Sequence, residues 1–234
     1  QLWLPMSFPP LTQQEVINKL DRVPVFSVVD RNDRILPTRT AGEQCVTWYA
    51  DLEEAKAVLT EMKAQFPGQG LKLHTTPLGT AFALTEGWLN PPGTDAPPSP
   101  PLQLQPSRAT LATTDTDKFG AGNTRTGPFP LFLSENLQGD DMFPLFLTRA
   151  DFVATWLANG LKEEDLPTIM TTDLRMLVRK WQEDSTQDWH AMKLMPSAST
   201  LEWIQKHQAG LDDDPPPLLP HTSAPTAEEP PPPA

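Results

Sequence analysis

The side chains best suited to metal or acid–base chemistry are spread thinly along this sequence. The four histidines are His74, His190, His207 and His221, and none has a second histidine at the H-x-x-x-H spacing with a third ligand nearby. His74 and His190 fall on segments that we predict to be strands, one in each half of the chain. This spacing favours histidines of the core or the surface over metal ligands.

Carboxylates and glycines form no catalytic pattern either. Asp115 with Asp117, and the run Asp212–Asp214, lie in segments without hydrophobic periodicity, whereas paired carboxylates need a rigid pocket for acid–base work. The glycines are scattered and form neither a phosphate-binding loop nor the G-x-S-x-G turn of a serine nucleophile. We therefore predict no catalytic residue, no cofactor and no metal, and we expect that the protein is not an enzyme.

A single cysteine, Cys45, lies in the apolar run Cys45–Trp48, without a neighbouring histidine or a C-x-x-C spacing. A lone thiol in such a run is typical of a small buried hydrophobic residue. It cannot form an internal disulfide, so the fold does not rely on one.

Tryptophan is the unusual feature, with seven in the chain. Those that we expect on helices fall on apolar faces, which is typical of core residues. Trp88 precedes a proline-rich stretch, and Trp189 begins a predicted strand beside His190. Aromatic side chains at such positions could contact an extended apolar peptide. The alternative is a half-buried aromatic at the edge of the fold. We take Trp88 and Trp189 as candidate peptide- or partner-binding residues.

The net charge of -12 argues against general nucleic-acid binding, because a protein needs a basic surface to neutralise phosphates. It also argues against simple electrostatic attachment to an anionic membrane. No apolar stretch reaches the roughly 20 residues that span a bilayer, so we expect no transmembrane segment and leave peripheral association open. The chain begins at Gln1 and not at Met, which leaves open a targeting peptide removed upstream.

A short apolar string opens each half of the chain, Val23–Phe26 in the first and Phe129–Phe132 in the second. Each string is followed by a second apolar run that leads into a capped amphipathic helix. Each block then reaches a Thr-Thr pair with a leucine two residues beyond, at Thr75–Leu78 and at Thr171–Leu174. Three landmarks in one order, present twice, predict a duplicated half-domain.

Capping signals and apolar runs predict the individual elements. Capping boxes at Thr12–Glu15, Asp51–Glu54 and Ser199–Glu202, with caps at Thr148 and Thr172, predict five helices. β-rich apolar runs predict strands at 23–29, 44–49, 71–75, 128–134, 143–147, 168–170 and 189–195. Residues 35–39 suggest the return strand of a hairpin, and residues 76–87 suit either a short helix or a further strand.

These elements predict an α/β (α+β) fold of two similar pseudo-repeat halves, each a small sheet with packed helices, in one continuous body. Seven prolines between residues 91 and 106 predict a stiff connection or an exposed loop. The expected segments are an apolar extended arm (1–11), a first half-domain (12–90), a Pro-rich, low-complexity junction (91–127), a second half-domain (128–210) and a disordered acidic Pro-rich tail (211–234).

Several of these apolar motifs resemble the Tic22 family. They are Val23–Phe26, the DLEEA run Asp51–Ala55, the Pro-Leu-Phe string at 130–132 and the PLFLTRADF run Pro144–Phe152. The resemblance covers residues 12–207, and its motifs are structural rather than catalytic. What it implies about function is therefore an analogy at the level of family and fold.

That family comprises chloroplast, apicoplast and cyanobacterial proteins tied to protein translocation and outer-membrane biogenesis. The resemblance implies a soluble, chaperone-like protein-transport factor that binds unfolded precursor proteins beside an Omp85-type barrel. It places the protein between two membranes, in the cyanobacterial periplasm or the plastid intermembrane space. Apolar grooves between the halves would hold extended segments weakly, without nucleotide. The alternative is a structural or peripheral subunit of a larger membrane-associated complex, with residues 1–11 as a docking segment.

Overall fold

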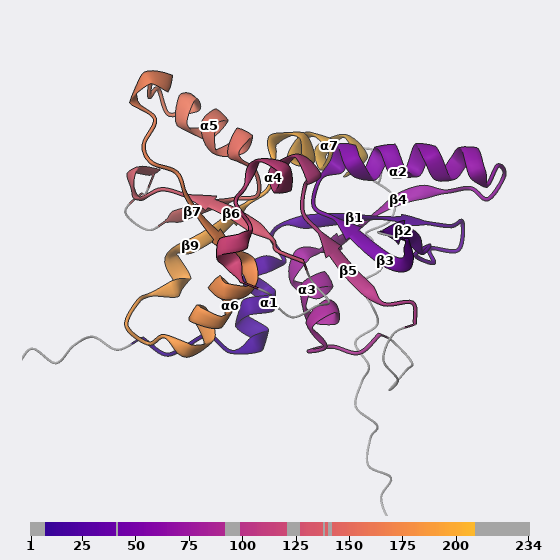
Figure 1. Ribbon diagram of the computed structural model, residues 1–234, viewed down its shortest axis with the longest axis horizontal. Helices are drawn as coiled ribbons and strands as arrows, with labels where there is room; N and C mark the ends of the chain where they lie inside the picture. The colour runs from indigo at the N-terminus through magenta and orange to yellow at the C-terminus, as the bar shows by residue number, and fades with distance from the viewer. Residues whose placement is uncertain are drawn as a thin grey trace, which may run out of the picture.

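The computed structural model places two small mixed sheets side by side, with helices on both faces (Figure 1). The residues described are 8–40, 42–91, 99–120, 127–137, 139 and 142–208. Most of the predicted arm and all of the predicted tail lie outside these ranges. Within them, no helix is long and apolar enough to cross a membrane.

Within these ranges the chain forms a five-stranded sheet, a four-stranded sheet and seven α-helices. The first sheet contains β1 (Pro24–Val29), β2 (Thr38–Thr40), β3 (Glu43–Tyr49), β4 (Lys72–Pro77) and β5 (Leu102–Gln105). The second contains β6 (Pro130–Leu133), β7 (Phe143–Phe146), β8 (Met170–Asp173) and β9 (Met192–Met195). The helices are α1 (Gln13–Leu20), α2 (Leu52–Gln65), α3 (Leu78–Glu86), α4 (Arg108–Thr113), α5 (Arg149–Ala158), α6 (Leu174–Glu183) and α7 (Ala198–Gln208).

The two sheets repeat one topology, which confirms the duplication predicted from the sequence. β1 pairs antiparallel with β3 and β4, and β3 pairs parallel with β5. β6 pairs in the same way with β7 and β8, and β7 pairs parallel with β9. Even the register repeats, because Phe26 lies opposite Thr75 and Phe132 lies opposite Thr171. The first sheet adds β2, which pairs with β3.

Successive side chains of the central strand in each sheet point to opposite faces, so one face contributes to a shared core and the other to a separate outer cluster. Val25 and Leu131 belong to one large buried cluster to which both halves contribute. The next residues, Phe26 and Phe132, belong to separate clusters on the opposite faces of the two sheets. Helices α1, α3 and α6 contribute buried side chains to the shared core. The two halves are therefore joined by one hydrophobic core.

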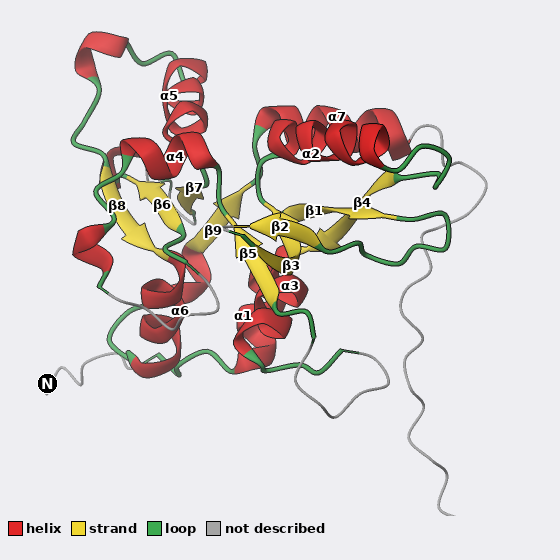
Figure 2. Cartoon of the chain, turned by 45° about the vertical axis from the view of Figure 1, so that its right-hand side comes forward, coloured by secondary structure: helices red, strands yellow, loops and turns green. Residues whose placement is uncertain are grey.

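The outer faces are covered by helices from both halves. α2 lies over the first sheet and α5 over the second (Figures 1 and 2). α7 ends the second half, yet it packs beside α2 on the first sheet, where Trp203 meets Phe26 edge-to-face with ring centroids 5.3 Å apart. α4 ends the first half and lies close to α5 in both views. The last helix of each half therefore extends toward the other half.

α1 and α3 cross at a glycine. A Cβ at Gly79 would overlap the carbonyl oxygen of Ile17 and stand 2.6 Å from Oδ1 of Asp21. That same Oδ1 accepts the backbone N–H of Thr80 at 2.9 Å. Asp21 therefore caps the N-terminus of α3, whose own N-cap residue, Pro77, makes no side-chain cap. α1 and α3 are held together by close backbone approach and by this capping bond.

The structure differs from the sequence prediction at four strands. β8 (Met170–Asp173) begins at the last residue of the strand predicted at 168–170. Residues 102–105, predicted within a stiff connection, form β5, because Leu104 is buried in the shared core and the segment pairs with β3. Residues 35–39 form the predicted return strand only in part. Ile35 makes an antiparallel bridge with Val29, and the N–H of Leu36 donates to the carbonyl of Val28 at 2.9 Å, but β2 begins at Thr38 and pairs with β3. The predicted strand at 189–195 begins with the 3₁₀ helix Trp189–Ala191, so His190 is not on a strand.

The capping box at Thr12 is confirmed, with Thr12 Oγ1 accepting the N–H of Glu15 and Glu15 accepting the N–H of Thr12. The box predicted at Asp51 is only half formed. Asp51 caps α2, but the carboxylate of Glu54 accepts the backbone N–H of Arg108 instead of reaching back. Glu54 thereby holds the start of α4 against α2.

Two further helix starts lie one or two residues from the predicted position. α6 is capped by Asp173 and not by Thr172. At the start of α7, Ser197 Oγ accepts the N–H of Thr200, so Ser199 does not act as the cap. Residues 76–87, for which the sequence suited either a helix or a strand, contain the helix α3. This helix ends at Gly87 in the left-handed conformation.

Candidate functional site

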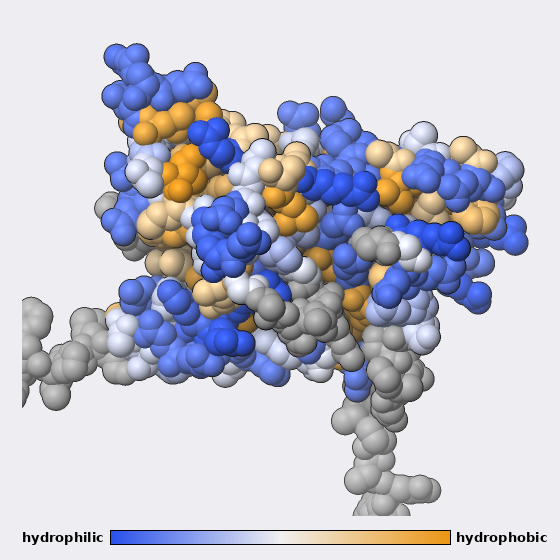
Figure 3. Space-filling view, viewed as in Figure 1, coloured by the Kyte–Doolittle hydropathy of each residue, from blue (hydrophilic) through white to orange (hydrophobic). Residues whose placement is uncertain are grey.

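Apolar side chains lie exposed on α5 and on the segment that leads to β8. Leu157, Leu161 and Met170 are 45%, 39% and 41% exposed. Leu166 and Ile169 are half-buried against the outer aromatic cluster of the second sheet. We call these five residues the α5 apolar surface. Figure 3 shows hydrophobic side chains reaching the surface along α5.

Rigid packing beneath α5 positions this surface. Phe146 of β7 meets Phe152 of α5 edge-to-face, with ring centroids 5.5 Å apart. Thr148 caps the helix by accepting the N–H of Asp151 at 3.0 Å. At the other end, Nε1 of Trp156 donates to the carbonyl of Lys162 at 2.8 Å and fixes the turn that follows. The exposed leucines therefore project from an ordered support, which lowers the entropic cost of binding.

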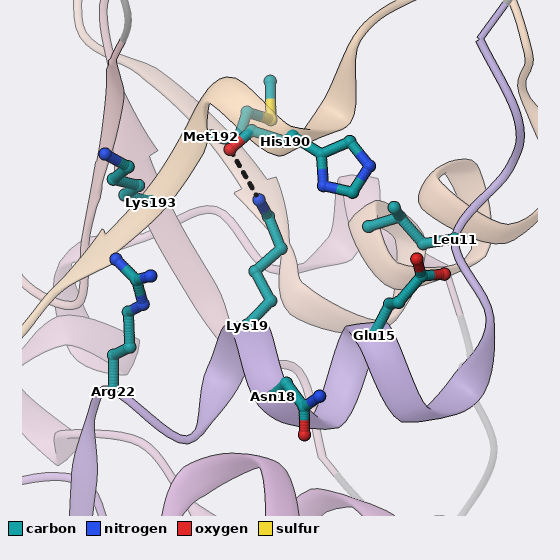
Figure 4. A pocket seen from close by; sticks show the side chains of 8 residues that line it. All are labelled: Leu11, Glu15, Asn18, Lys19, Arg22, His190, Met192 and Lys193. Atoms are coloured by element: carbon teal, nitrogen blue, oxygen red, sulfur yellow. Dashed lines mark hydrogen bonds between the residues drawn. The ribbon is translucent and has the colours of Figure 1, made fainter.

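A second candidate is a pocket of about 240 Å³ between α1 and β9, which we call the α1–β9 pocket. α1 and its two ends supply Leu11, Glu15, Asn18, Lys19 and Arg22, and the segment of β9 supplies His190, Met192 and Lys193. Residues three and four positions apart lie on one face of a helix, so α1 presents several of these lining residues on the side that faces β9. Figure 4 shows Arg22 and Lys193 on one side of Lys19 and His190 on the other.

Lys19 is the central cation of this pocket. Its Nζ donates to the carbonyl of His190 at 3.2 Å and lies 5.3 Å from the ring centroid of Trp181. Partial burial, helped by the nearby charge of Arg22, lowers the pKa of Lys19 to about 8, although Asp188 acts in the opposite direction. The pocket therefore holds positive charge where that charge is poorly solvated.

The acid that lines the same pocket is already engaged. The Glu15 carboxylate accepts the backbone N–H and the hydroxyl of Thr12, both at 2.8 Å, and these hydrogen bonds lower the pKa of Glu15. Among the described residues, no ion pair joins a carboxylate to Lys19, Arg22 or Lys193.

The two tryptophans singled out from the sequence lie elsewhere. Trp88 is half-buried and packs edge-to-face on Phe82, with ring centroids 5.4 Å apart. Trp189 is 5% exposed, and its Nε1 donates to the carbonyl of Asp184 at 2.7 Å. Trp189 is thus a core residue with little surface for a partner, although it directly precedes His190 of the α1–β9 pocket. A role in partner binding stays a prediction for both tryptophans.

The remaining reactive groups fit structural roles. Cys45 is buried, and burial raises the pKa of its thiol, which disfavours the nucleophilic thiolate. Burial also lowers the pKa of His74. In the part of the chain that the structure describes, no three His, Cys, Asp or Glu side chains gather in a way that could hold a metal ion.

Sequence reasoning missed the α1–β9 pocket, because its lining comes from segments about 170 positions apart. Lys19 and the His190 carbonyl that it contacts are 171 residues apart. The one local signal was the placement of Glu15, Lys19 and Arg22 at helical spacing, which resembles any solvated helix face.

Comparison with known proteins identifies the fold. No protein-family model matches the sequence, and no curated protein matches it. The structure is similar to that of Tic22 from Plasmodium falciparum, with 19% identity, a TM-score of 0.60 and coverage of 83% of this chain and 98% of that chain. It is also similar to Tic22 from Anabaena, described as a protein of protein transport, with 20% identity, a TM-score of 0.58 and coverage of 84% and 97%. The chain therefore has a Tic22-like fold.

Proposed function

We propose that this chain is a non-enzymatic protein-transport factor that binds extended segments of precursor proteins, in the manner of a chaperone. The observation that supports it is the fold, which is shared over nearly the whole length of two Tic22 structures, one of them described as a protein of protein transport. In this proposal the protein works between two membranes, in the cyanobacterial periplasm or the plastid intermembrane space. Its partners are precursor proteins and an Omp85-type outer-membrane barrel, in import or outer-membrane biogenesis.

We assign the precursor contact to the α5 apolar surface and not to apolar grooves between the halves. The shared core joins the halves, and the α1–β9 pocket that lies between them is lined mostly by polar and charged side chains. Covering the exposed part of Leu157, Leu161 and Met170 contributes about 1 kcal/mol for each side chain. The three together contribute about 3 kcal/mol, so the contact is weak for one segment, with a dissociation constant on the order of 10 mM. Weak contacts suit a factor that must release its client, and the assigned residues require no nucleotide.

The test is binding of a fluorescently labelled, carboxymethylated model protein that cannot fold, measured by anisotropy. The double variant Leu157→Ser with Met170→Ser should bind it about thirtyfold more weakly than the unmodified chain, because two exposed apolar contacts of about 1 kcal/mol each are removed. Phe66→Ser is the matched control, since Phe66 is 44% exposed beyond the end of α2 in the first half. Both variants change solvent-exposed side chains, and circular dichroism checks their folding.

The outcomes separate the alternatives. Saturable binding that the α5 variant weakens and the Phe66 variant preserves supports the proposal. Absence of binding to the unfolded protein would overturn it. A stable one-to-one complex with a purified Omp85-type barrel, without binding to unfolded chains, would instead support a structural subunit of a membrane-associated complex.

A further inference from the structure

Three cations line the α1–β9 pocket, and none of them forms an ion pair with a carboxylate in the part of the chain that the structure describes. Lys19 comes from α1, Arg22 from the link to β1 and Lys193 from β9, and all three line the pocket. Figure 4 shows Lys19 reaching toward the His190 carbonyl, with Arg22 and Lys193 on its other side. The other charged or titratable groups that face Lys19 are Glu15, Asp188 and His190. Glu15 accepts hydrogen bonds from Thr12, and Asp188 accepts the backbone N–H of His190 at 2.9 Å; these neutral donors do not cancel the charge of either carboxylate. Within the described ranges neither acid forms an ion pair with the three cations, which outnumber the two carboxylates and leave the pocket with an excess of one positive charge.

This arrangement carries an electrostatic cost. Arg22 and Lys193 both act to lower the pKa of Lys19, so the three cations repel one another in a partly desolvated place. An anion in the pocket would remove that repulsion and would gain charge-assisted hydrogen bonds. The cluster stands on a chain of net charge -12, so it is a local feature and not part of a general basic surface.

The rest of the lining indicates the kind of anion. A cavity of about 240 Å³ is smaller than the roughly 300–1,000 Å³ typical of cofactor and drug sites, so it suits a group the size of one or two side chains. Leu11 and Met192 add apolar surface beside the cations, which suits a carboxylate with an apolar neighbour. β9 is the last strand of the second sheet and pairs only with β7 among the described strands, so an extended chain finds a sheet edge next to the pocket.

We propose that the α1–β9 pocket binds an acidic peptide segment, with a carboxylate held among Lys19, Arg22 and Lys193 and an adjacent apolar side chain against Leu11 and Met192. The site is separate from the α5 apolar surface and does not depend on the precursor binding proposed above. It would give a protein of this fold a second, charge-selective contact for an acidic partner.

The probe is a fluorescein-labelled peptide of alternating Asp and Leu, with an Asn–Leu peptide as the neutral comparison. Arg22→Gln and Lys193→Gln should each weaken binding of the Asp–Leu peptide about tenfold, the effect of losing one charge-assisted hydrogen bond. Arg22 is exposed and Lys193 is half-buried, so both variants should fold. Lys206→Gln changes the net charge equally at an exposed position of α7 and should leave binding unchanged. As a second readout, the bound peptide should slow acetylation of Lys19, followed by mass spectrometry, because a neighbouring carboxylate raises the pKa of the amine.

Four results would overturn the proposal. The first is equal binding of the Asn–Leu peptide, and the second is unchanged affinity in both pocket variants. The third is full displacement of the peptide by inorganic phosphate, and the fourth is variant-sensitive binding to anionic vesicles without peptide binding. Either of the last two would assign the pocket to a different anion. Because Leu157→Ser with Met170→Ser leaves the pocket intact, failure here is distinguishable from failure of the precursor-binding proposal.

Discussion

Gly79→Ala tests the contact on which the position of α1 depends. The new methyl group would overlap the Ile17 carbonyl oxygen and stand 2.8 Å from its carbonyl carbon, and backbone atoms cannot rotate away as a side chain does. Overpacking of this kind lowers the free energy of unfolding by about 1–3 kcal/mol or more, while the better helix propensity of alanine raises it by at most about 1 kcal/mol. The displaced Asp21 carboxylate also loses its bond to Thr80, which costs about 1 kcal/mol. We expect the free energy of unfolding to fall by about 2–3 kcal/mol.

The assay is urea and thermal unfolding followed by far-ultraviolet circular dichroism. For a chain of this size a loss of 2–3 kcal/mol lowers Tm by roughly 5–10 °C. Gly127→Ala is the control, because a Cβ there meets nothing within 4 Å. Since α1 carries Lys19 and Arg22, Gly79→Ala should also weaken binding of the Asp–Leu peptide. A Gly79→Ala variant as stable as the unmodified chain would refute the close α1–α3 crossing.

Three further outcomes follow from single side chains. Asp21→Ala should destabilise the fold by about 1 kcal/mol in urea unfolding, and Asp21→Asn by less, because an amide oxygen can still accept the Thr80 N–H. Folding lowers the pKa of Lys19 from 10.5 to about 8, so between pH 8 and 10.5 its amine binds fewer protons in the folded chain than in the unfolded chain. The free energy of unfolding should therefore rise with pH through that window and stay flat below it, when it is compared with that of Lys19→Met. Trp203→Ala should lower the free energy of unfolding by about 2 kcal/mol and speed amide hydrogen exchange in α7, because the half-buried ring anchors that helix on Phe26. Unchanged exchange would contradict this packing.

Local signals account for what could be predicted. The capping box at Thr12 and the caps at Asp51 and Thr148 act within three residues, and the structure contains all three. The repeated order of apolar strings and Thr-Thr pairs predicted two similar halves, and both sheets share one strand order and register. A local signal failed where a distant group competed for it: the carboxylate of Glu54 accepts the backbone N–H of Arg108 in α4 instead of completing the capping box of its own helix.

The sequence alone therefore determined most of the helices and strands, the duplication and the α/β class, because periodicity and capping depend on residues a few positions apart. Tertiary structure decided the rest. It made residues 102–105 a strand by supplying β3 as a partner, buried Trp189, and gave α3 its cap from Asp21. It also brought Lys19 and Arg22 to Lys193, across most of the described chain. Burial and the clustering of charges depend on which segments come into contact although they are distant in the sequence. Local patterns such as periodicity and capping do not specify those contacts.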